Sequence, residues 1–257
     1  MSISAQKVTL RRGKKTLIED ISIDIVPGKV LAVIGPNGAG KSTLLSVLAG
    51  DNKPTSGYIE YDYKNIDRLD INQRALTRSV MSQAQAIAFN FSVTEIVKMG
   101  WLYYNHNRYE NDFQKTLDKI AQQCDIVHLL DRTYNTLSGG EQKRVHFARA
   151  LLQLWLPEGT NQNRYLLLDE PLANLDITHE IRMLQIIRQK AENGIGALMV
   201  LHDLNLAARF ADNVALLNQG KLIAQGTPKE VLNQASLSDV YGIPITVKHN
   251  PLTVTYY

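Results

Sequence analysis

Cysteine is almost absent from this sequence, and no hydrophobic run is long enough to cross a bilayer. The single cysteine, Cys124, has no partner for an internal disulfide. The longest apolar stretches, VLAVIG and ALMVL, are as long as strands and fall short of the roughly 18 residues of a membrane-spanning helix. The opening residues MSISAQKV show neither the cationic nor the apolar region of a secretory signal. We therefore expect a soluble protein of the reducing cytosol, which can still dock on a membrane protein.

A strong net charge, internal repeats and low-complexity linkers are lacking as well. The formal net charge of the 257 residues is +3, short of the clustered positive excess that dedicated nucleic-acid binders carry. We expect no nucleic-acid partner. The chain is long enough to bury a substantial core, and its hydrophobic fraction of 44% is ordinary for a globular protein.

What is present predicts an α/β fold with a parallel sheet. Alternating apolar and polar residues up to the Pro27-Gly28 break indicate an antiparallel β region. Continuously apolar segments such as VLAVIG and YLLLD indicate strands that are buried on both faces. The segment NDFQKTLDKIAQQCDIVHLL has apolar residues at helical spacing. The tail predicts a hairpin turning at Asn218 to Gly220, followed by a helix with a capping box at Thr227 to Glu230.

The stretch GPNGAGKS fits the phosphate-binding pattern G-x-x-x-x-G-K-[ST] and lies between a predicted buried strand and a predicted helix. Backbone amides of such a loop hold phosphate oxygens, the lysine contacts the β- and γ-phosphates, and the serine hydroxyl binds Mg²⁺. The alternative is a glycine-rich turn that binds nothing. The predicted ATP-binding residues of this loop are Gly35, Pro36, Asn37, Gly38, Ala39, Gly40, Lys41, Ser42 and Thr43.

Polar side chains end the predicted strands. Asp169 and Glu170 follow YLLL, where Asp169 is placed to bind Mg²⁺ and Glu170 to polarise a water molecule; the alternative is an acidic helix cap. His202 follows ALMVL at the edge where α/β proteins bind ligands, although a lone histidine is usually a surface or core residue. Gln83 follows VMS and could contact the metal or the water, or be a surface glutamine.

The stretch LSGGEQKR predicts a second helix start suited to an anion. Ser138 and Glu141 have capping-box spacing, and Gly139 and Gly140 leave the helix end free of side chains. Unpaired amides and the positive end of the helix dipole favour phosphate there. The sequence therefore predicts two phosphate-binding helix starts in one chain.

Across nearly its whole length, the chain resembles the nucleotide-binding subunits of ATP-binding-cassette transporters. The resemblance rests on GPNGAGKST, the glutamine of VMSQ, LSGGEQ, LLLDEP, ANLD and the histidine of LHD, in the family's order. It implies a P-loop core of RecA-like fold with an N-terminal antiparallel β region and an inserted helical subdomain. On this basis we expect one domain over residues 1–257, with the core in 1–87 and 156–257 and the helical subdomain in 88–155.

The resemblance also implies a reason for two phosphate sites. In this family the signature helix of one subunit faces the γ-phosphate of ATP bound to the P-loop of the other, so two chains enclose two nucleotides. It assigns Glu170, His202 and Gln83 to catalysis, Ser42, Gln83 and Asp169 to Mg²⁺, and Asp176 to the dimer loop. Ser138, Gly139, Gly140 and Glu141 form the signature. The expected ligands are ATP and Mg²⁺, and the expected assembly is a homodimer.

One position departs from the family. The aromatic residue that usually stacks on adenine, just before an early glycine, is replaced by Arg12 in TLRRGKKT. Because a guanidinium plane can also stack on a base, we expect Arg12 to contribute to ATP binding.

The segment AFNFSVTEIVKMGW and the tail resemble the importers of iron chelates, haem and vitamin B12. Extra residues in QLWLPEGTNQNRY resemble the haem-importer ATPases; the alternative is a neutral loop extension. This predicts a peripheral subunit at the cytoplasmic face of the inner membrane, bound to two permease subunits and served indirectly by a periplasmic haem-binding protein. A siderophore or cobalamin importer is the alternative within transport. A soluble non-transport cassette ATPase is expected to carry tandem cassettes or a coiled-coil insertion, and this chain has neither.

Overall fold

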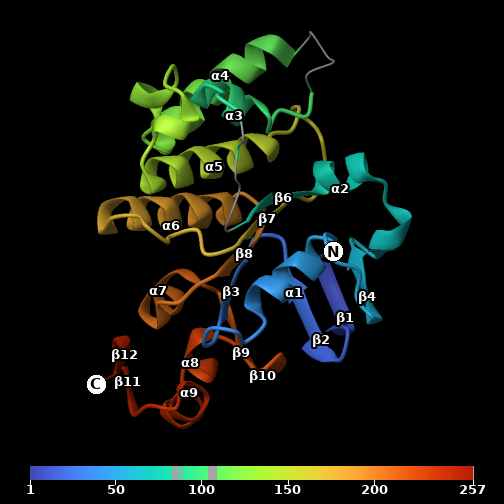
Figure 1. Ribbon diagram of the computed structural model, residues 1–257, viewed down its shortest axis with the longest axis vertical. Coiled ribbons are helices and arrows are strands. Elements are labelled where there is room, and N and C mark those ends of the chain that lie inside the picture. Colours follow the sequence, from blue (N-terminus) through green and yellow to red (C-terminus); the bar gives the residue numbers. More distant parts are fainter. Residues whose placement is uncertain (83–86, 88, 104–108, 257) are drawn as a thin grey trace.

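The computed structural model describes residues 1–82, 87, 89–103 and 109–256, and it arranges them as two sheets and a hairpin with helices between and above them (Figure 1). The strands are β1 (Ile3–Arg12), β2 (Lys15–Ile25), β3 (Val30–Ile34), β4 (Ser56–Tyr61), β5 (Lys64–Asn65), β6 (Arg78–Met81), β7 (Tyr165–Leu168), β8 (Gly196–Val200), β9 (Asn213–Asn218), β10 (Lys221–Gly226), β11 (Ile245–His249) and β12 (Leu252–Tyr256). The helices are α1 (Lys41–Leu48), α2 (Ile71–Thr77), α3 (Val93–Lys98), α4 (Glu110–Gln123), α5 (Gly139–Gln153), α6 (Ile177–Glu192), α7 (Leu204–Phe210), α8 (Pro228–Val231) and α9 (Gln234–Tyr241).

The six-stranded sheet has the order β10-β9-β3-β8-β7-β6, and all its pairs are parallel except β10 with β9. All residues of β3, β7 and β8 are buried, as expected of strands covered on both faces. The predicted α/β architecture with a parallel sheet is confirmed. Because the strands are parallel, their carboxyl ends meet at one edge, and the loops after β3, β7 and β8 lie together there.

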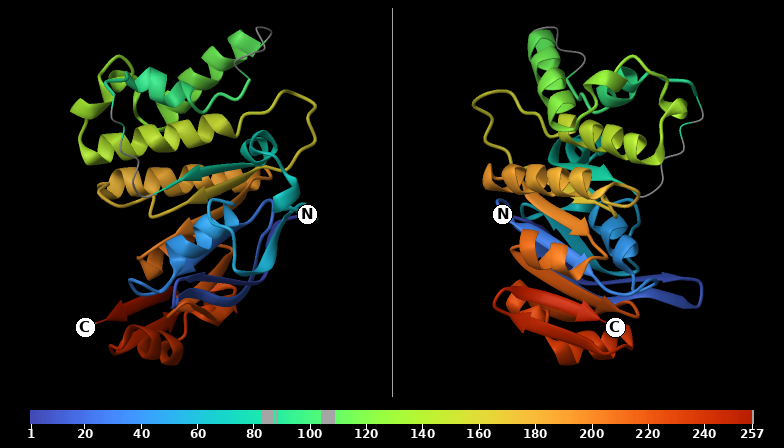
Figure 2. Two further views of the ribbon diagram at one scale, coloured as in Figure 1. Left: turned by 45° about the vertical axis from the view of Figure 1, so that its right-hand side comes forward. Right: turned by 90° about the vertical axis from the view of Figure 1, so that its left-hand side faces the viewer.

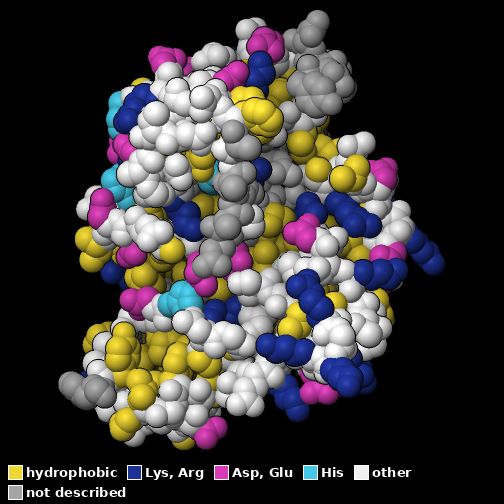
Figure 3. Space-filling view, in the orientation of Figure 1, with side chains coloured by type: hydrophobic (Ala, Val, Ile, Leu, Met, Phe, Trp, Pro, Cys, Tyr) yellow, Lys and Arg dark blue, Asp and Glu magenta, His cyan; other side chains and the backbone are white. Residues whose placement is uncertain are grey.

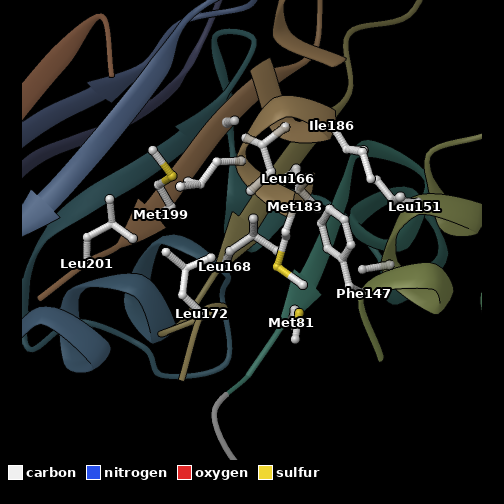
Figure 4. Packing of buried hydrophobic residues seen from close by; sticks show 14 of the residues in the cluster. Met81, Phe147, Leu151, Leu166, Leu168, Leu172, Met183, Ile186, Met199 and Leu201 are labelled. Atoms are coloured by element: carbon white, nitrogen blue, oxygen red, sulfur yellow. The ribbon is translucent and has the colours of Figure 1, made fainter. Parts of the chain in front are cut away.

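Side chains of β3 alternate between two hydrophobic clusters. Leu31 and Val33 join a cluster that is shared with α1 and with the antiparallel sheet of order β2-β1-β4-β5. Val30, Ala32 and Ile34 join the other cluster, on the face covered by α5 and α6. Figure 4 shows the packing of that second cluster; the labelled residues are Met81, Phe147, Leu151, Leu166, Leu168, Leu172, Met183, Ile186, Met199 and Leu201. The antiparallel β region that the first thirty residues predict is present.

Helices α3, α4 and α5 form a layer at one end of the molecule, above α6 and the β6 and β7 edge of the sheet (Figures 1 and 2). The apolar pattern that predicted helix beyond Gln123 is interrupted. Asp125 has a left-handed φ of 54°, and a short 3-10 turn follows at Val127–Leu129. Further 3-10 turns occupy Ile66–Arg68 and Tyr134–Thr136.

The C-terminal hairpin of β11 and β12 lies at the end opposite the helical layer (Figure 2). The predicted hairpin of β9 and β10 is present, with its turn at Gln219 and Gly220, and Thr227 and Glu230 form the predicted capping box of α8. Among the described residues, no helix is both long enough and apolar enough to pass through a membrane.

Candidate functional site

The loop between β3 and α1 is shaped by close approaches that only glycine permits. Gly35 has φ 145°, and a Cβ there would lie 2.1 Å from the carbonyl oxygen of Leu217. Gly40 is the N-cap of α1 with φ 102°, and no side chain caps the helix. The first amides of α1 therefore face the loop without a competing side-chain acceptor, an arrangement suited to phosphate.

Lys41 is turned inward over this loop. Its Nζ donates to the carbonyl oxygens of Gly35 at 2.8 Å and Pro36 at 3.0 Å, and the residue is 5% exposed. Burial lowers the pKa of this ammonium, while the carboxylates of Glu170 and Asp169 act in the opposite direction. A buried cation held only by carbonyl oxygens can exchange these contacts for the stronger charge-assisted bonds of phosphate oxygens.

The loop opens into a cavity of about 460 Å³. Residues 37–43 and Glu170 line it, together with Lys15, Thr16 and Leu17 of β2 and the turn at Gln219 and Gly220. The residues of β2 and of this turn were not expected from the sequence. Gly220 allows the turn to lie close to β2, because a Cβ on this residue would lie 2.7 Å from the carbonyl oxygen of Leu17. The Gly220 N–H also donates to the carbonyl oxygen of Ala39 at 3.0 Å.

Arg12 is not among the described residues that line this cavity. It ends β1 opposite Lys15 in the ladder, on the exposed tip formed by Arg11, Arg12, Lys14 and Lys15. Figure 3 shows Lys and Arg side chains gathered over this side of the molecule, across β1, β2 and α2. The tip supplies positive charge beside the cavity, and the stacking of Arg12 on a base stays a prediction.

The carboxyl ends of β7 and β8 bring three expected residues together. The Ser42 hydroxyl donates to Asp169 Oδ1 at 3.0 Å. His202 Nε2 lies 2.8 Å from Glu170 Oε1. Glu170 has a left-handed φ of 47°, a costly conformation for a residue with a Cβ and one that is concentrated at functional sites. Gln83, the fourth expected residue, lies outside the described residues.

Buried charges surround this edge. Asp169 is 6% exposed, and burial raises the pKa of its carboxyl group, partly offset by the hydrogen bond from Ser42. Lys143 of α5 faces the same two carboxylates, and burial lowers the pKa of its ammonium. Lys143 was not expected from the sequence, because its proximity to Asp169 and Glu170 depends on how α5 packs against the sheet.

The second phosphate-binding helix start has the expected local geometry. The Ser138 N–H donates to Glu141 Oε2 at 2.7 Å, and the Glu141 N–H donates to Ser138 Oγ at 3.3 Å. A Cβ on Gly140 would lie 2.9 Å from the carbonyl oxygen of Asn174, whereas one on Gly139 would meet nothing within 4 Å. Gly140 is therefore needed for packing within the chain, and Gly139 leaves an open surface.

A separate cavity of about 520 Å³ adjoins this helix start. It is lined by residues 138–141 of the signature, by residues 174–176, and by Arg144 and His179. Among the described residues, none lines both this cavity and the one at Lys41. Each chain thus presents two distinct phosphate-suited surfaces.

A phosphate-binding loop, an acidic strand end and a histidine at one edge of a parallel sheet define a P-loop nucleotide-binding protein. The sequence pattern of the family described as "ABC transporter" matches residues 18–173. The chain belongs to this family and is one of its ATP-binding cassettes.

Similar proteins can be aligned with this chain over almost its full length. A "Hemin import ATP-binding protein HmuV" of Pseudomonas fluorescens is 42% identical over 249 residues, covering 97% of this chain and 96% of the relative. One of the same name from Hahella chejuensis is 39% identical over 251 residues, covering 98% and 96%. A solved structure described as "Structure of ATP binding subunit of ABC transporter" matches with a TM-score of 0.81 at 21% identity, covering 94% of this chain and 98% of that one. This structural similarity shows that the two chains share a fold.

Proposed function

We propose that this chain is the ATP-hydrolysing subunit of a haem importer. It works as a homodimer, peripheral to the cytoplasmic face of the inner membrane, on two permease subunits that receive haem from a periplasmic binding protein. One observation carries the hydrolytic part: Glu170 and His202 lie 2.8 Å apart beside the loop that holds Lys41. The haem part is supported by relatives named for hemin import at about 40% identity over nearly the whole chain, and by the QLWLPEGTNQNRY segment.

The P-loop residues bind and orient ATP. Amides of residues 37–43 and the ammonium of Lys41 take the phosphate oxygens, and Lys41 gives up its contacts with Gly35 and Pro36. Residues of β2 and the β9–β10 turn form the remaining wall for the nucleoside. Arg12 stacks on the adenine from the hairpin tip.

Glu170 and His202 act on the water that attacks the γ-phosphate. The Glu170 carboxylate accepts a hydrogen bond from this water and takes up its proton, which aligns the oxygen for in-line attack. His202 holds the Glu170 carboxylate through the 2.8 Å contact and can turn to the γ-phosphate. The strained backbone at Glu170 fixes the carboxylate at the edge of the cavity.

Ser42 and Asp169 fit a magnesium ion. A hydroxyl and a carboxylate oxygen only 3.0 Å apart are ligands of the kind that Mg²⁺ prefers, and Gln83 would add its amide oxygen. When bound, Mg²⁺ neutralises charge on the β- and γ-phosphates. Removal of Asp169's negative charge, as in Asp169→Asn, would weaken this site while leaving the P-loop intact.

The signature surface completes the site of a second copy. Gly139 and Gly140 present helix amides toward the partner's γ-phosphate, and Ser138 adds its hydroxyl, while the Ser138 and Glu141 amides are occupied in the capping box. Asp176 lines the same cavity and is the dimer-loop residue of this proposal. Two chains then share two nucleotides.

Uptake by the assembled transporter tests the proposal. We expect proteoliposomes that hold the permease pair and this chain to accumulate haem when ATP and the haem-loaded binding protein are supplied. The matched control is Glu170→Gln, which keeps the shape and loses the charge, so that hydrolysis falls about a hundredfold or more while ATP still binds. Uptake of a ferric siderophore or cobalamin but not haem contradicts the substrate. Wild-type hydrolysis by Glu170→Gln contradicts the role of Glu170.

A further inference from the structure

A chain of charged side chains crosses from α6 to the helical layer beside the signature. His179, in the first turn of α6, places Nδ1 2.9 Å from Asp176 Oδ2 and Nε2 3.2 Å from Asp125 Oδ2. Asp176 also caps α6, because its Oδ1 accepts from the His179 N–H at 2.9 Å. The imidazole therefore bridges two carboxylates from segments about fifty residues apart in the sequence.

Each ring nitrogen thus faces a carboxylate oxygen at hydrogen-bond distance, so the ring links the two side chains. Asp125 accepts in addition from Arg144 of α5 at 3.0 Å and lies 3.9 Å from Arg182 of α6. The hydrogen bond from His179 is the largest cause that lowers the pKa of Asp125.

Other ionisable groups nearby set the local field. His128, after α4, adds positive charge toward Asp125. Glu180, next to His179, adds negative charge toward Asp176, and burial raises the pKa of Glu180. The cluster thus contains Asp176, Asp125 and Glu180 against Arg144, Arg182 and the two histidines.

The cluster holds together surfaces that the proposed dimer needs. Asp176 belongs to the loop whose Asn174 carbonyl lies against Gly140, and Arg144 is on the signature helix. His179 and Arg144 both line the signature cavity. Because Arg144 of α5 holds Asp125 at 3.0 Å, a shift of α5 relative to α6 would strain the His179 to Asp125 contact and move Gly140 away from Asn174.

We propose that His179 is a positioning residue: its imidazole ties Asp176 to Asp125, so that the signature and the loop of residues 174–176 present one rigid surface to the partner's nucleotide. This rests on the proposed function. His179 acts through its contacts with the two carboxylates, which set the hydrolysis rate through the orientation of the signature.

The test compares variants of the full chain in its transporter at one pH. His179→Ala removes the bridge, and His179→Arg places a guanidinium there that can donate to both carboxylates. We expect the kcat of His179→Ala to be about five-fold or more below that of the wild type, the lower range of measured couplings between sites. KM for ATP stays unchanged.

His179→Arg is expected to recover part of the lost kcat. His249→Ala, in the hairpin at the opposite end of the molecule, is the matched histidine control and follows the wild type. A wild-type kcat in His179→Ala, or an effect confined to KM, overturns the proposal.

A second measurement does not depend on hydrolysis. In nucleotide-free protein, amide hydrogen exchange at residues 138–141 and 174–176 is compared between wild type and His179→Ala at equal pH. We expect faster exchange in the variant. Equal exchange in both proteins overturns the bridge, and it does so whether or not the chain hydrolyses ATP.

Discussion

At the residue scale, His146 shows how burial changes the chemistry of a side chain. It lies on α5 with 8% of its surface exposed, and its Nε2 is 2.6 Å from the Tyr134 hydroxyl. Burial, with a smaller contribution from Arg149 and Lys143, lowers the pKa of His146 from 6.5 to about 4. The folded chain therefore keeps this ring neutral at a pH where the unfolded chain protonates it.

This difference predicts an acid-sensitive stability. As pH falls from 6.5 toward about 4, the unfolded chain binds a proton that the folded chain does not, so the free energy of unfolding decreases by about 1.4 kcal/mol per pH unit. His146→Gln keeps an acceptor for Tyr134 and carries no titratable group. Urea unfolding at several pH values should show a smaller acid loss in the variant. Identical pH slopes for the two proteins would contradict the assignment to His146.

Residue types at strand ends could be predicted, but their contacts could not. Asp169, Glu170 and His202 were expected at one edge because carboxyl ends of parallel strands meet there. The left-handed backbone of Glu170 and its 2.8 Å approach to His202 depend on the whole sheet and leave no local signal. Lys15 was missed for a similar reason, since its place in the cavity follows from the packing of the β9–β10 turn on β2.

At the element scale, two adjacent glycines of α5 have different roles. Gly140 lies against the backbone of Asn174, whereas Gly139 faces open space within its own chain. One glycine is required by this chain's packing. The other is required only if something outside the chain binds there.

Two alanine substitutions separate these roles. Gly140→Ala forces a Cβ to within 2.9 Å of the Asn174 carbonyl oxygen, so we expect the free energy of unfolding to fall by about 1 kcal/mol or more. Gly139→Ala should leave stability equal or higher, since alanine is the better helix former, and yet lower hydrolysis by the dimer. Urea unfolding and ATPase assays on each variant measure both quantities. Full hydrolysis by Gly139→Ala would show that the partner's phosphate binds elsewhere.

Local rules predicted helix starts better than helix ends. The capping boxes at Ser138 and Thr227 involve residues three apart, and both formed. The end of α4 at Gln123 was missed, because apolar residues continue at helical spacing to Leu130. Asp125 takes a left-handed conformation there and is held by Arg144 and His179, contacts that only the tertiary fold creates.

At the scale of the whole molecule, the separation of the two phosphate-suited cavities decides how the site is assembled. The P-loop cavity contains Lys41 and Glu170, and the signature cavity contains Ser138 and Asp176. No described residue lines both, and in the proposed dimer a nucleotide bound at Lys41 obtains its signature contacts from the second chain. Two variants that damage different cavities should therefore complement each other.

Ser138→Arg and Lys41→Ala test this in mixed dimers. The arginine fills the signature surface of one chain, and the alanine removes the phosphate contact of the other; each variant alone should be inactive. A mixed dimer keeps one intact site, made of Lys41 from the first chain and Ser138 from the second. In an equal mixture half the dimers are mixed, so hydrolysis should return to about a quarter of the wild-type rate if the two sites of a symmetric dimer act independently. The control mixes a chain that carries both substitutions with an equal amount of wild type. Every mixed dimer then lacks an intact site, so hydrolysis should fall to about a quarter of the wild-type rate, which comes from the wild-type dimers, whereas sites formed within one chain would leave about a half. If equal mixtures of the single variants stay inactive while crosslinking shows that mixed dimers form, either the two cavities do not meet across the interface or one damaged site silences the other. Retention of ATP by the mixed dimer after free nucleotide is removed then separates these outcomes. A site that is closed by the partner's signature retains its ATP, whereas a P-loop that does not meet the signature releases it.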